Sequence, residues 1–345
     1  MAIKTKLMER LGMKVPIISA PMGPFYTTEL TIAVSEAGGL GVLSHTNLEG
    51  KDSLKEMQNN MLKVIEHTDK PFGFNIRTAR MQPDADMLCR RIPRFIMENQ
   101  KLREQCVYAL TSAGSPTMLP ETVTWKKLKE SNPNTMHFHV APAKWLAEKC
   151  VARGVEGLVL TGTEGGGHQS YEKVSTLVLL QEAQQAWPDI PKVACGGFAT
   201  GESLAAALAL GAGAIAMGSR FIASKESEFH DEYKKIIPGA KDTDTNLYTG
   251  VFGPIRLWNN EYAKSHPVVE NKDAKIAQEQ SLDVKALMED QRHYELTYKG
   301  DIQNGAVLLG QSIGIINDIK NVKDIIDDIV KGAEAAIKRI SAMIS

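Results

Sequence analysis

A glycine-rich loop that ends in a histidine is the segment of the chain best suited to chemistry. Residues 161–168 read TGTEGGGH, so four glycines precede His168 within a few positions. Glycine permits close approach of the backbone to a ligand, and an imidazole accepts or donates a proton near neutral pH. The pattern therefore indicates that His168 is a general acid or base. The alternative is a histidine that only caps a surface loop.

Two further glycine loops have the composition of a phosphate site. Residues 195–201 read CGGFATG, and residues 217–221 read MGSRF. Because glycine has no Cβ, its N–H can approach a phosphate oxygen, and a following helix N-terminus adds positive partial charge. A serine hydroxyl can donate one more hydrogen bond. We predict that phosphate binds to these loops at Gly196, Gly197, Gly218 and Ser219. The alternative is that the glycines only form tight turns.

Two other segments could hold a planar ring. Residues 20–24 read APMGP, and two prolines around a glycine make a rigid loop. Asn75, within FGFNIR, carries an amide that can bond both the donor and the acceptor edge of a heterocycle. The alternative for Asn75 is a hydrogen bond to the backbone at a strand end. Arg77 lies two residues further on and could hold an anion.

Eight short apolar runs could bring these loops together. The runs lack the alternation of half-exposed strands, as expected for strands buried on both faces. Helical patterns separate them, which favours a parallel (β/α)8 barrel, the TIM barrel, over a sandwich or a bundle. In such barrels the active site lies on the loops after the carboxyl ends of the strands, and the loops after strands seven and eight form a recurring phosphate site. The runs are residues 15–20, 41–44, 72–76, 107–111, 136–140, 157–160, 192–195 and 214–217.

The chain continues well beyond the last of these strands. We therefore place the barrel in residues 10–224 and a second region in residues 225–345. Residues 225–299 are polar and follow no clear pattern, whereas residues 303–345 carry apolar side chains at helical spacing. The predicted fold is a barrel with a C-terminal helical subdomain or lid over its mouth. The alternative is a C-terminal helix that packs only on the outside of the barrel.

Composition excludes several classes of protein. The chain is 43% hydrophobic and 23% charged, and its net charge of -1 gives no indication of nucleic-acid or membrane binding. No stretch approaches the length of a membrane span, and the N-terminus lacks the apolar run of a signal peptide, so we expect a cytoplasmic protein. The cysteines stand alone, which argues against a zinc site or a disulfide framework. They are Cys89, Cys106, Cys150 and Cys195.

Three other histidines lie on or near strands, and we interpret His45, His137 and His139 as structural groups. No carboxylate lies close to them in sequence, so no metal site is predicted. The chain also lacks a P-loop and a G-x-G-x-x-G motif after a strand. A tightly bound NAD domain and a nucleotide hydrolase are therefore disfavoured, although NAD(P)H stays open as a transient electron donor.

As an ordered set, these motifs resemble the nitronate monooxygenase (2-nitropropane dioxygenase-like) family. That family also includes FMN-type enoyl-acyl-carrier-protein reductases and some NAD(P)H:quinone reductases. The similarity spans roughly residues 10–225 and resumes near residue 305. The matching segments are PIISAPMG (16–23), SEAGGLGVLS (35–44), GFNI (73–76), TEGGGH (163–168), ACGGFATGESLAAALALGA (194–212), AMGSRFIAS (216–224) and, more weakly, GQSIGII (310–316).

The resemblance implies that FMN binds over the barrel mouth and that His168 occupies the position of the family's catalytic histidine. In nitronate-oxidising members this histidine serves as a base or an electrostatic partner of the nitro substrate. In the reductases a pyridine nucleotide reduces FMN, which then passes a hydride to an enoyl thioester or a quinone. The cofactor-binding residues that the resemblance implies are Ala20, Pro21, Met22, Asn75, Gly167, Gly196, Gly197, Gly218 and Ser219.

Motifs that hold FMN are shared across different reactions, so the sequence leaves three functions open. The first is a nitronate monooxygenase-like oxidation of alkyl nitronates with O2. The second is an NAD(P)H-dependent FMN reductase of enoyl thioesters, as enoyl-ACP or enoyl-CoA, or of quinones. The third is a flavin-binding scaffold without catalysis. The basic segment 77–103 could bind the phosphate of an acyl-CoA or a carrier protein, or be a solvated helix face. The expected partner is a small molecule, with a homodimer as one option for assembly.

Overall fold

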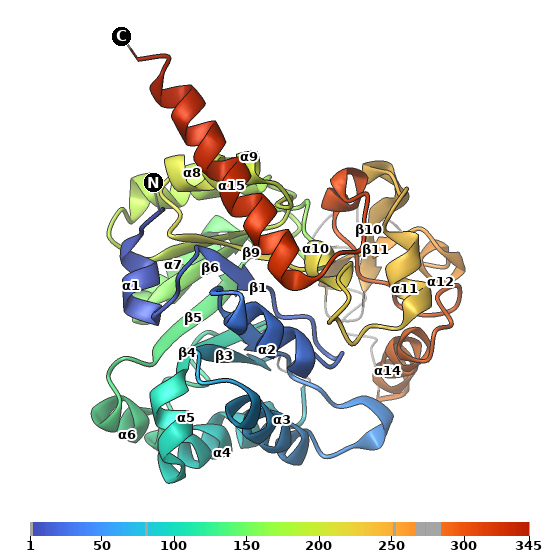
Figure 1. Ribbon diagram of the computed structural model, residues 1–345. Helices are drawn as coiled ribbons and strands as arrows, with labels where there is room; N and C mark the ends of the chain where they lie inside the picture. The colour runs from blue at the N-terminus through green and yellow to red at the C-terminus, as the bar shows by residue number, and fades with distance from the viewer. Residues whose placement is uncertain (1–2, 80–81, 251–252, 267–272, 274–283, 345) are drawn as a thin grey trace.

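Eight parallel strands form a closed barrel in the computed structural model, which describes residues 3–79, 82–250, 253–266, 273 and 284–344 (Figure 1). The strand order around the barrel is β1-β9-β8-β6-β5-β4-β3-β2. The Ser19 N–H donates to the Leu40 carbonyl, and the Leu40 N–H donates to the Ile17 carbonyl. These two bonds join the start of β2 to β1 and close the barrel. The predicted (β/α)8 barrel is confirmed. Its strands are β1 (Ile17–Ser19), β2 (Gly41–Leu43), β3 (Phe72–Arg77), β4 (Cys106–Ser112), β5 (Met136–Ala141), β6 (Gly157–Thr161), β8 (Lys192–Cys195) and β9 (Ala214–Met217).

The barrel interior is filled by apolar side chains from alternate strand positions. Tyr108 and Phe138 lie side by side there, with ring centroids 4.9 Å apart, and Val159 and Val193 belong to the same buried cluster. A short helix, α1 (Lys6–Leu11), contributes its buried face to this cluster and closes the amino-terminal end of the barrel. The interior is therefore a packed core, and open space is left at the carboxyl ends of the strands.

Helices cover the outer faces of the strands, and side-chain caps define where several of them begin. Asp52 caps α3, Thr122 caps α6, Ser175 caps α8 and Thr200 caps α9, each by accepting a backbone N–H of the first turn. These caps explain why polar residues stand just before the apolar helical patterns. The helices are α2 (Thr28–Glu36), α3 (Ser53–His67), α4 (Ala85–Glu98), α5 (Gln100–Gln105), α6 (Val123–Ser131), α7 (Lys144–Ala152), α8 (Thr176–Ala186) and α9 (Gly201–Ala209).

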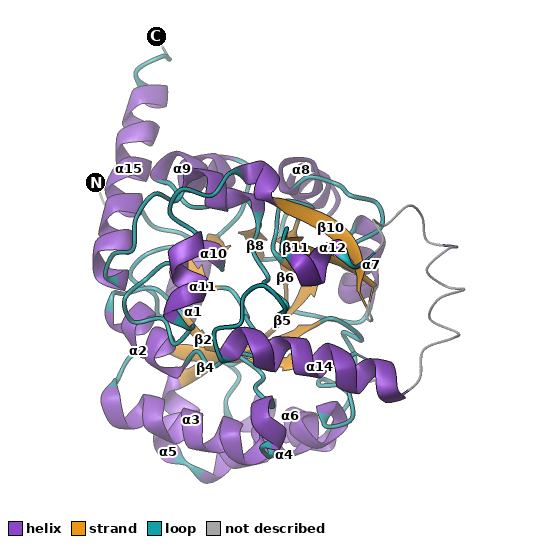
Figure 2. Cartoon of the chain, turned by 90° about the vertical axis from the view of Figure 1, so that its right-hand side faces the viewer, coloured by secondary structure: helices purple, strands orange, loops and turns teal. Residues whose placement is uncertain are grey.

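The chain after β9 builds a cover over the barrel mouth, which Figure 2 shows in front of the strands. This cover contains a β-hairpin, which the polar composition of residues 225–299 did not predict. The hairpin forms a second sheet with β7 (Gly167–His168), in the order β10-β11-β7. Part of that polar segment, residues 267–272 and 274–283, lies outside the described residues. The cover consists of α10 (Ser219–Ile222), α11 (Asp231–Ile236), η2 (Asp242–Asp244), β10 (Thr245–Gly250), β11 (Gly253–Trp258), α12 (Glu261–Lys264), α14 (Val284–Tyr298) and η3 (Gln311–Ile315).

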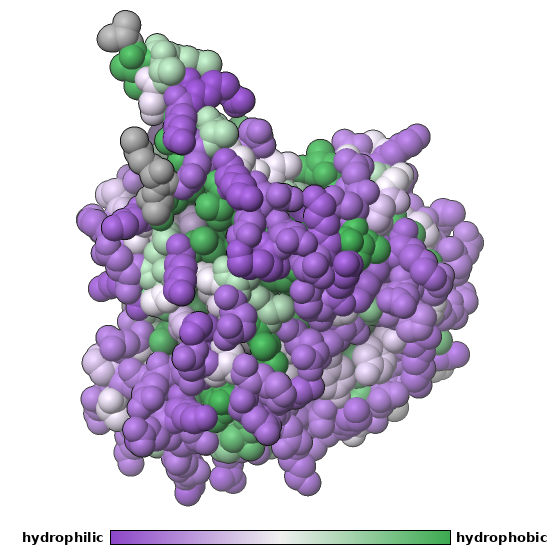
Figure 3. Space-filling view, viewed as in Figure 1, coloured by the Kyte–Doolittle hydropathy of each residue, from purple (hydrophilic) through white to green (hydrophobic). Residues whose placement is uncertain are grey.

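The last helix, α15 (Val322–Ser341), packs on the outside of the barrel against α9 and α2. Gly201 and Gly332 allow close contact with α9, because a Cβ at Gly201 would lie 2.3 Å from the Ala333 nitrogen. Both alternatives for the C-terminal region thus hold in part: the chain before α15 covers the mouth, and α15 packs outside it. Its end projects from a largely hydrophilic face (Figure 3). Among the described residues, no helix has the length and apolar character to cross a membrane.

Candidate functional site

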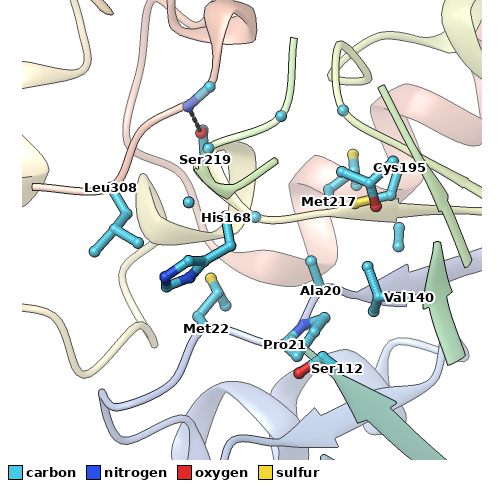
Figure 4. Close-up of a pocket in the computed structure, with 18 of the residues that line it drawn as sticks. Ala20, Pro21, Met22, Ser112, Val140, His168, Cys195, Met217, Ser219 and Leu308 are labelled. Carbon is cyan, nitrogen blue, oxygen red and sulfur yellow. Dashed lines mark hydrogen bonds between the residues drawn. The ribbon is translucent and has the colours of Figure 1, made fainter. Parts of the chain in front are cut away.

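One pocket lies between the carboxyl ends of the strands and the cover, with about 1110 Å³ of empty space that is partly open to solvent. Every site residue predicted from the sequence borders it, and Figure 4 shows several of them facing a common space. Segments far apart in the chain therefore meet at one place. The residues are Ala20, Pro21, Met22, Asn75, Gly167, His168, Gly196, Gly197, Gly218 and Ser219.

Glycines after β8 and β9 line one side of the pocket as an open cradle. Gly196 and Gly197 have φ of +88° and +86°, which side chains other than glycine rarely adopt. A Cβ at Gly197 or Gly218 would meet its nearest neighbour at an ordinary 3.7 or 3.8 Å. No described residue fills these positions, so the backbone is accessible to a ligand. Such a cradle suits phosphate oxygens.

Ser219 stands at the start of α10, beside this cradle. Its hydroxyl oxygen accepts the Gly310 N–H at 3.0 Å, as the dashed line in Figure 4 marks. The hydroxyl proton is not used by that bond and can be donated to an anion. The N-terminus of the longer helix α9 is already capped, because Thr200 and Ser203 bond each other's backbone N–H groups. The helix that begins at the predicted phosphate site is therefore α10.

A second wall of the pocket is formed by the loop after β1, which adjoins the cradle because β1 pairs with β9, and by Asn75 on β3. The backbone N–H groups of Ala20 and Met22 bond the Met217 carbonyl and the Ser44 hydroxyl, which fixes the loop. The buried Asn75 amide donates to the Leu110 carbonyl at 3.2 Å. The structural alternative for Asn75 is thus observed, while its bonding to a cofactor ring stays a prediction.

His168 is held at the pocket by the hairpin of the cover. In the second sheet His168 pairs with Ile255 and Gly167 pairs with Arg256, in antiparallel register. The next N–H, of Gln169, donates to the Pro254 carbonyl at 2.8 Å. Figure 4 shows the imidazole projecting into the pocket on the side of Met22 and Leu308. A backbone fixed on both sides of the residue restricts where the imidazole can lie.

Two charged residues that the sequence did not single out anchor the loop before His168. Arg256 donates from Nε to the Thr163 carbonyl at 2.7 Å, and its Nη1 bonds the Thr245 hydroxyl at 3.2 Å. On the barrel side, the Glu164 carboxylate accepts the N–H of Thr176 at 3.0 Å. The alternation of GPIRLW could have indicated a strand, but nothing in the sequence connects that strand with residue 163.

An aromatic group, formed by Phe25 of the loop after β1 and by Phe229 and Tyr233 of the cover, makes the outer wall of the pocket. The rings of Phe25 and Phe229 lie 4.8 Å apart, and those of Phe25 and Tyr233 lie 6.0 Å apart. The Tyr233 hydroxyl donates to the Leu308 carbonyl at 2.7 Å, so its polar end is satisfied. These side chains give the space outside the glycine cradle an apolar surface. Sequence reasoning missed this group because Phe25 lies about 200 residues before Phe229 and Tyr233 in the chain.

His45, His137 and His139 are buried, and none of them borders the pocket. The Thr111 hydroxyl lies 2.8 Å from His137 Nε2 and 2.7 Å from His139 Nδ1. Burial lowers the pKa of both His137 and His139 to about 3, so each imidazole is neutral. The His45 ring bonds Asp84 at 3.1 Å. Their interpretation as structural groups agrees with these contacts, and the described residues contain no cluster suited to a metal ion.

Fold and pocket place the chain in a general class: (β/α)8-barrel proteins with a ligand pocket at the carboxyl ends of the strands. The chain belongs to the nitronate monooxygenase family, whose model matches residues 4–332. The match covers the cover and most of α15 as well as the barrel.

Relatives and solved structures agree with this membership. A (3aS,4S,5R,7aS)-5-hydroxy-7a-methyl-1-oxo-octahydro-1H-indene-4-carboxyl-CoA dehydrogenase from Rhodococcus jostii is 29% identical, over 99% of this chain and 98% of the relative. A nitronate monooxygenase from Pseudomonas aeruginosa is 29% identical, over 70% of this chain and 76% of the relative. The structure of FabK from Thermotoga maritima superimposes with a TM-score of 0.81 at 30% identity, covering 99% of this chain and 100% of that chain. The named homologues are oxidoreductases, and the protein is accordingly an enzyme of this type.

Proposed function

We propose that the protein is an FMN-dependent oxidoreductase in which His168 holds or moves a proton of the substrate. The observation that supports this most directly is the geometry of the pocket. It joins an open glycine cradle at Gly197 and Gly218 to a fixed imidazole on another wall. The cradle fits a phosphate, and the rigid loop of residues 20–22 fits the edge of a planar ring.

Within this proposal the cofactor and the protein have separate tasks. FMN, when bound, supplies the transfer of electrons or hydride. His168 supplies a group that can titrate near neutral pH, next to the space that the aromatic wall leaves for a substrate. Cys195 also borders the pocket, but burial raises the pKa of its thiol to about 11. A neutral thiol is a weak nucleophile, so we assign no chemistry to Cys195.

Oxidation of alkyl nitronates with O2 is the first candidate reaction. Its support is membership of the nitronate monooxygenase family and the histidine at the pocket. A nitronate is a planar anion, and an imidazole beside it can stabilise its charge or remove the α-proton of the neutral nitroalkane. No electron donor other than the substrate is required for this reaction.

Redox chemistry of an acyl thioester is the second candidate, and one observation favours it. The dehydrogenase from Rhodococcus jostii, whose name specifies a carboxyl-CoA substrate, matches 99% of this chain, including the cover. Its identity of 29% over this length is slightly higher than the 26% of a probable nitronate monooxygenase from Staphylococcus saprophyticus, which matches 98% of this chain. In this reading NAD(P)H is the transient electron donor, with enoyl thioesters or quinones as acceptors.

An anaerobic absorbance spectrum of the purified protein, recorded before and after addition of NADH and then NADPH, tests the proposal. We expect a bound flavin spectrum. Bleaching by a nucleotide supports the thioester or quinone reductase, whereas reduction only by an alkyl nitronate supports the monooxygenase. A bound flavin that no substrate reduces supports the scaffold without catalysis. A protein that cannot take up FMN would contradict the proposed function.

A further inference from the structure

Arg77, at the end of β3, presents a cation at the pocket that the reaction described above does not use. Its Nη2 donates to the Asn47 side-chain oxygen at 2.9 Å. Its Nε is inaccessible to solvent and has no hydrogen-bond partner among the described residues. That nitrogen lies 3.6 Å from where a Cβ of Gly23 would stand, so it faces the loop that lines the pocket.

No carboxylate in the described part of the chain forms an ion pair with Arg77 within 4.0 Å. The acid Asp84 is bonded to His45 at 3.1 Å, and the charges of Asp84 and Asp290 act to raise the pKa of Arg77. Burial lowers the pKa of the Arg77 guanidinium, but a guanidinium remains charged in proteins. A buried cation without a paired anion is unfavourable, so the site is suited to an anion from a ligand.

The strand end that carries Arg77 is fixed by His45. The Arg77 backbone N–H donates to His45 Nδ1 at 3.1 Å. His45 Nδ1 is therefore the acceptor nitrogen, and the proton lies on Nε2, which donates to Asp84. These bonds fix the Arg77 backbone, and the bond from Nη2 to Asn47 orients the guanidinium, which lowers the entropy lost when an anion binds.

Arg77 lies on the far side of the barrel from the phosphate cradle. In the strand order, three strands separate β3 from β8 in either direction, so these strands lie opposite each other. The cradle follows β8, whereas Arg77 is placed between Asn47 of the loop after β2 and the loop containing Gly23. The aromatic wall begins two residues after Gly23, at Phe25. The cation is thus positioned for the substrate end of the pocket.

We propose that Arg77 binds a delocalised oxyanion of the substrate, and this inference rests on the proposed function. A guanidinium donates in a planar fork that matches two oxygens of one group. The chemical class is a planar oxygen anion on a short apolar chain: the two oxygens of a nitronate, or the enolate oxygen of a thioester. In either reaction Arg77 determines which substrates bind, while His168 remains the group that handles the proton.

Binding of a non-reacting carboxylate tests the assignment without turnover. The probe is sodium butanoate, with butanamide as its neutral counterpart, measured by titration calorimetry on the protein with and without FMN. The variants are Arg77→Gln and Arg77→Lys, and Arg94→Gln is the matched control because the Arg94 side chain is 60% exposed. FMN affinity is measured in parallel by flavin fluorescence.

We expect the wild type to bind butanoate at least tenfold more tightly than butanamide. Arg77→Gln should lose about tenfold to 100-fold in butanoate affinity, as expected for a charge-assisted hydrogen bond, with FMN affinity within about threefold. Arg77→Lys should retain part of the preference, because it keeps the charge but not the fork. Arg94→Gln should match the wild type.

Three results would overturn the inference: no preference for butanoate in the wild type, equal butanoate affinity in Arg77→Gln, or an equal loss of FMN affinity in that variant. The last result would assign the cation to the cofactor. If Arg77→Gln does not fold by circular dichroism, Arg77→Lys decides, since unchanged butanoate affinity there contradicts the planar fork. Failure of the wild type to bind FMN would contradict the proposed function alone, because butanoate binding to the cofactor-free protein still tests Arg77.

Discussion

Two residues at the pocket, His168 and Arg77, suit opposite tasks in one reaction. An imidazole changes charge near neutral pH, whereas a guanidinium keeps its charge throughout the physiological range. His168 is held through its backbone by β11, and Arg77 is held through its backbone by His45. We therefore propose proton transfer for His168 and charge recognition for Arg77. Mutation of His168 should therefore affect turnover, whereas mutation of Arg77 should affect the binding of an anionic substrate.

Replacement of His168 by alanine should lower turnover without loss of the cofactor. The residue lies on a different wall from the glycine cradle, so we expect FMN affinity to change by less than about threefold. Loss of a general acid or base costs roughly 10²–10⁴-fold in kcat. Steady-state kinetics with nitronates and enoyl thioesters, with flavin content measured in the same preparation, checks this. Unchanged turnover would remove His168 from the mechanism.

At the scale of elements, the hairpin β10–β11 determines the site as much as the barrel does. The barrel brings the glycine loops to one end, but the strand that pairs with His168 comes from the cover. Arg256 extends this contact to the Thr163 carbonyl, five residues earlier in the loop. The loop is therefore held at both ends by an element that lies about 90 residues further along the chain.

Replacement of Arg256 by methionine should loosen this loop. The side chain is buried, and the loss of its bonds to Thr163 and Thr245 leaves two carbonyl groups without their donor. We expect kcat to fall roughly tenfold to 100-fold because the imidazole is displaced, while FMN affinity changes little. Stopped-flow flavin reduction and thermal denaturation check this beside Arg292→Met, an exposed control. A fall in FMN affinity equal to the fall in kcat would show general unfolding of the pocket instead.

For the molecule as a whole, α15 joins the end of the chain to the barrel. Its apolar face packs on α9, which follows the Gly196–Gly197 loop directly. The cradle is thus supported from outside by the last helix. The assembly of the protein remains a proposal, a homodimer, that light scattering can measure.

Removal of one side chain from the contact of α15 with α9 should destabilise the whole fold. Ile326 is 0% exposed, so Ile326→Ala should lower the free energy of unfolding by about 2–5 kcal/mol. Ile340 on the same helix is 51% exposed, and Ile340→Ala should change the free energy of unfolding by less than about 0.5 kcal/mol. Chemical denaturation followed by fluorescence measures both. Equal values for the two variants would contradict the packing role of α15.

Local patterns were sufficient to predict the barrel, the glycine cradle and His168. A buried parallel strand is a short apolar run, and the loops after such strands meet at one end whatever the rest of the chain does. The residues that must adopt positive φ or approach a ligand closely are glycines, and their positions are visible in the sequence.

What only the tertiary structure decided depends on contacts between distant segments. The pairing of Ile255 with His168 and the bond from Arg256 to Thr163 have no local pattern. The same is true of the Arg77 Nε, which has no hydrogen-bond partner among the described residues, because a missing partner can be recognised only when the neighbours are in place. The spacing of apolar residues indicates which side of a helix or strand is buried, but not which other element packs against that side. For this reason the sequence by itself determined the glycine loops and the histidine of the pocket, whereas the fold decided which residues of the cover and of β3 stand beside them.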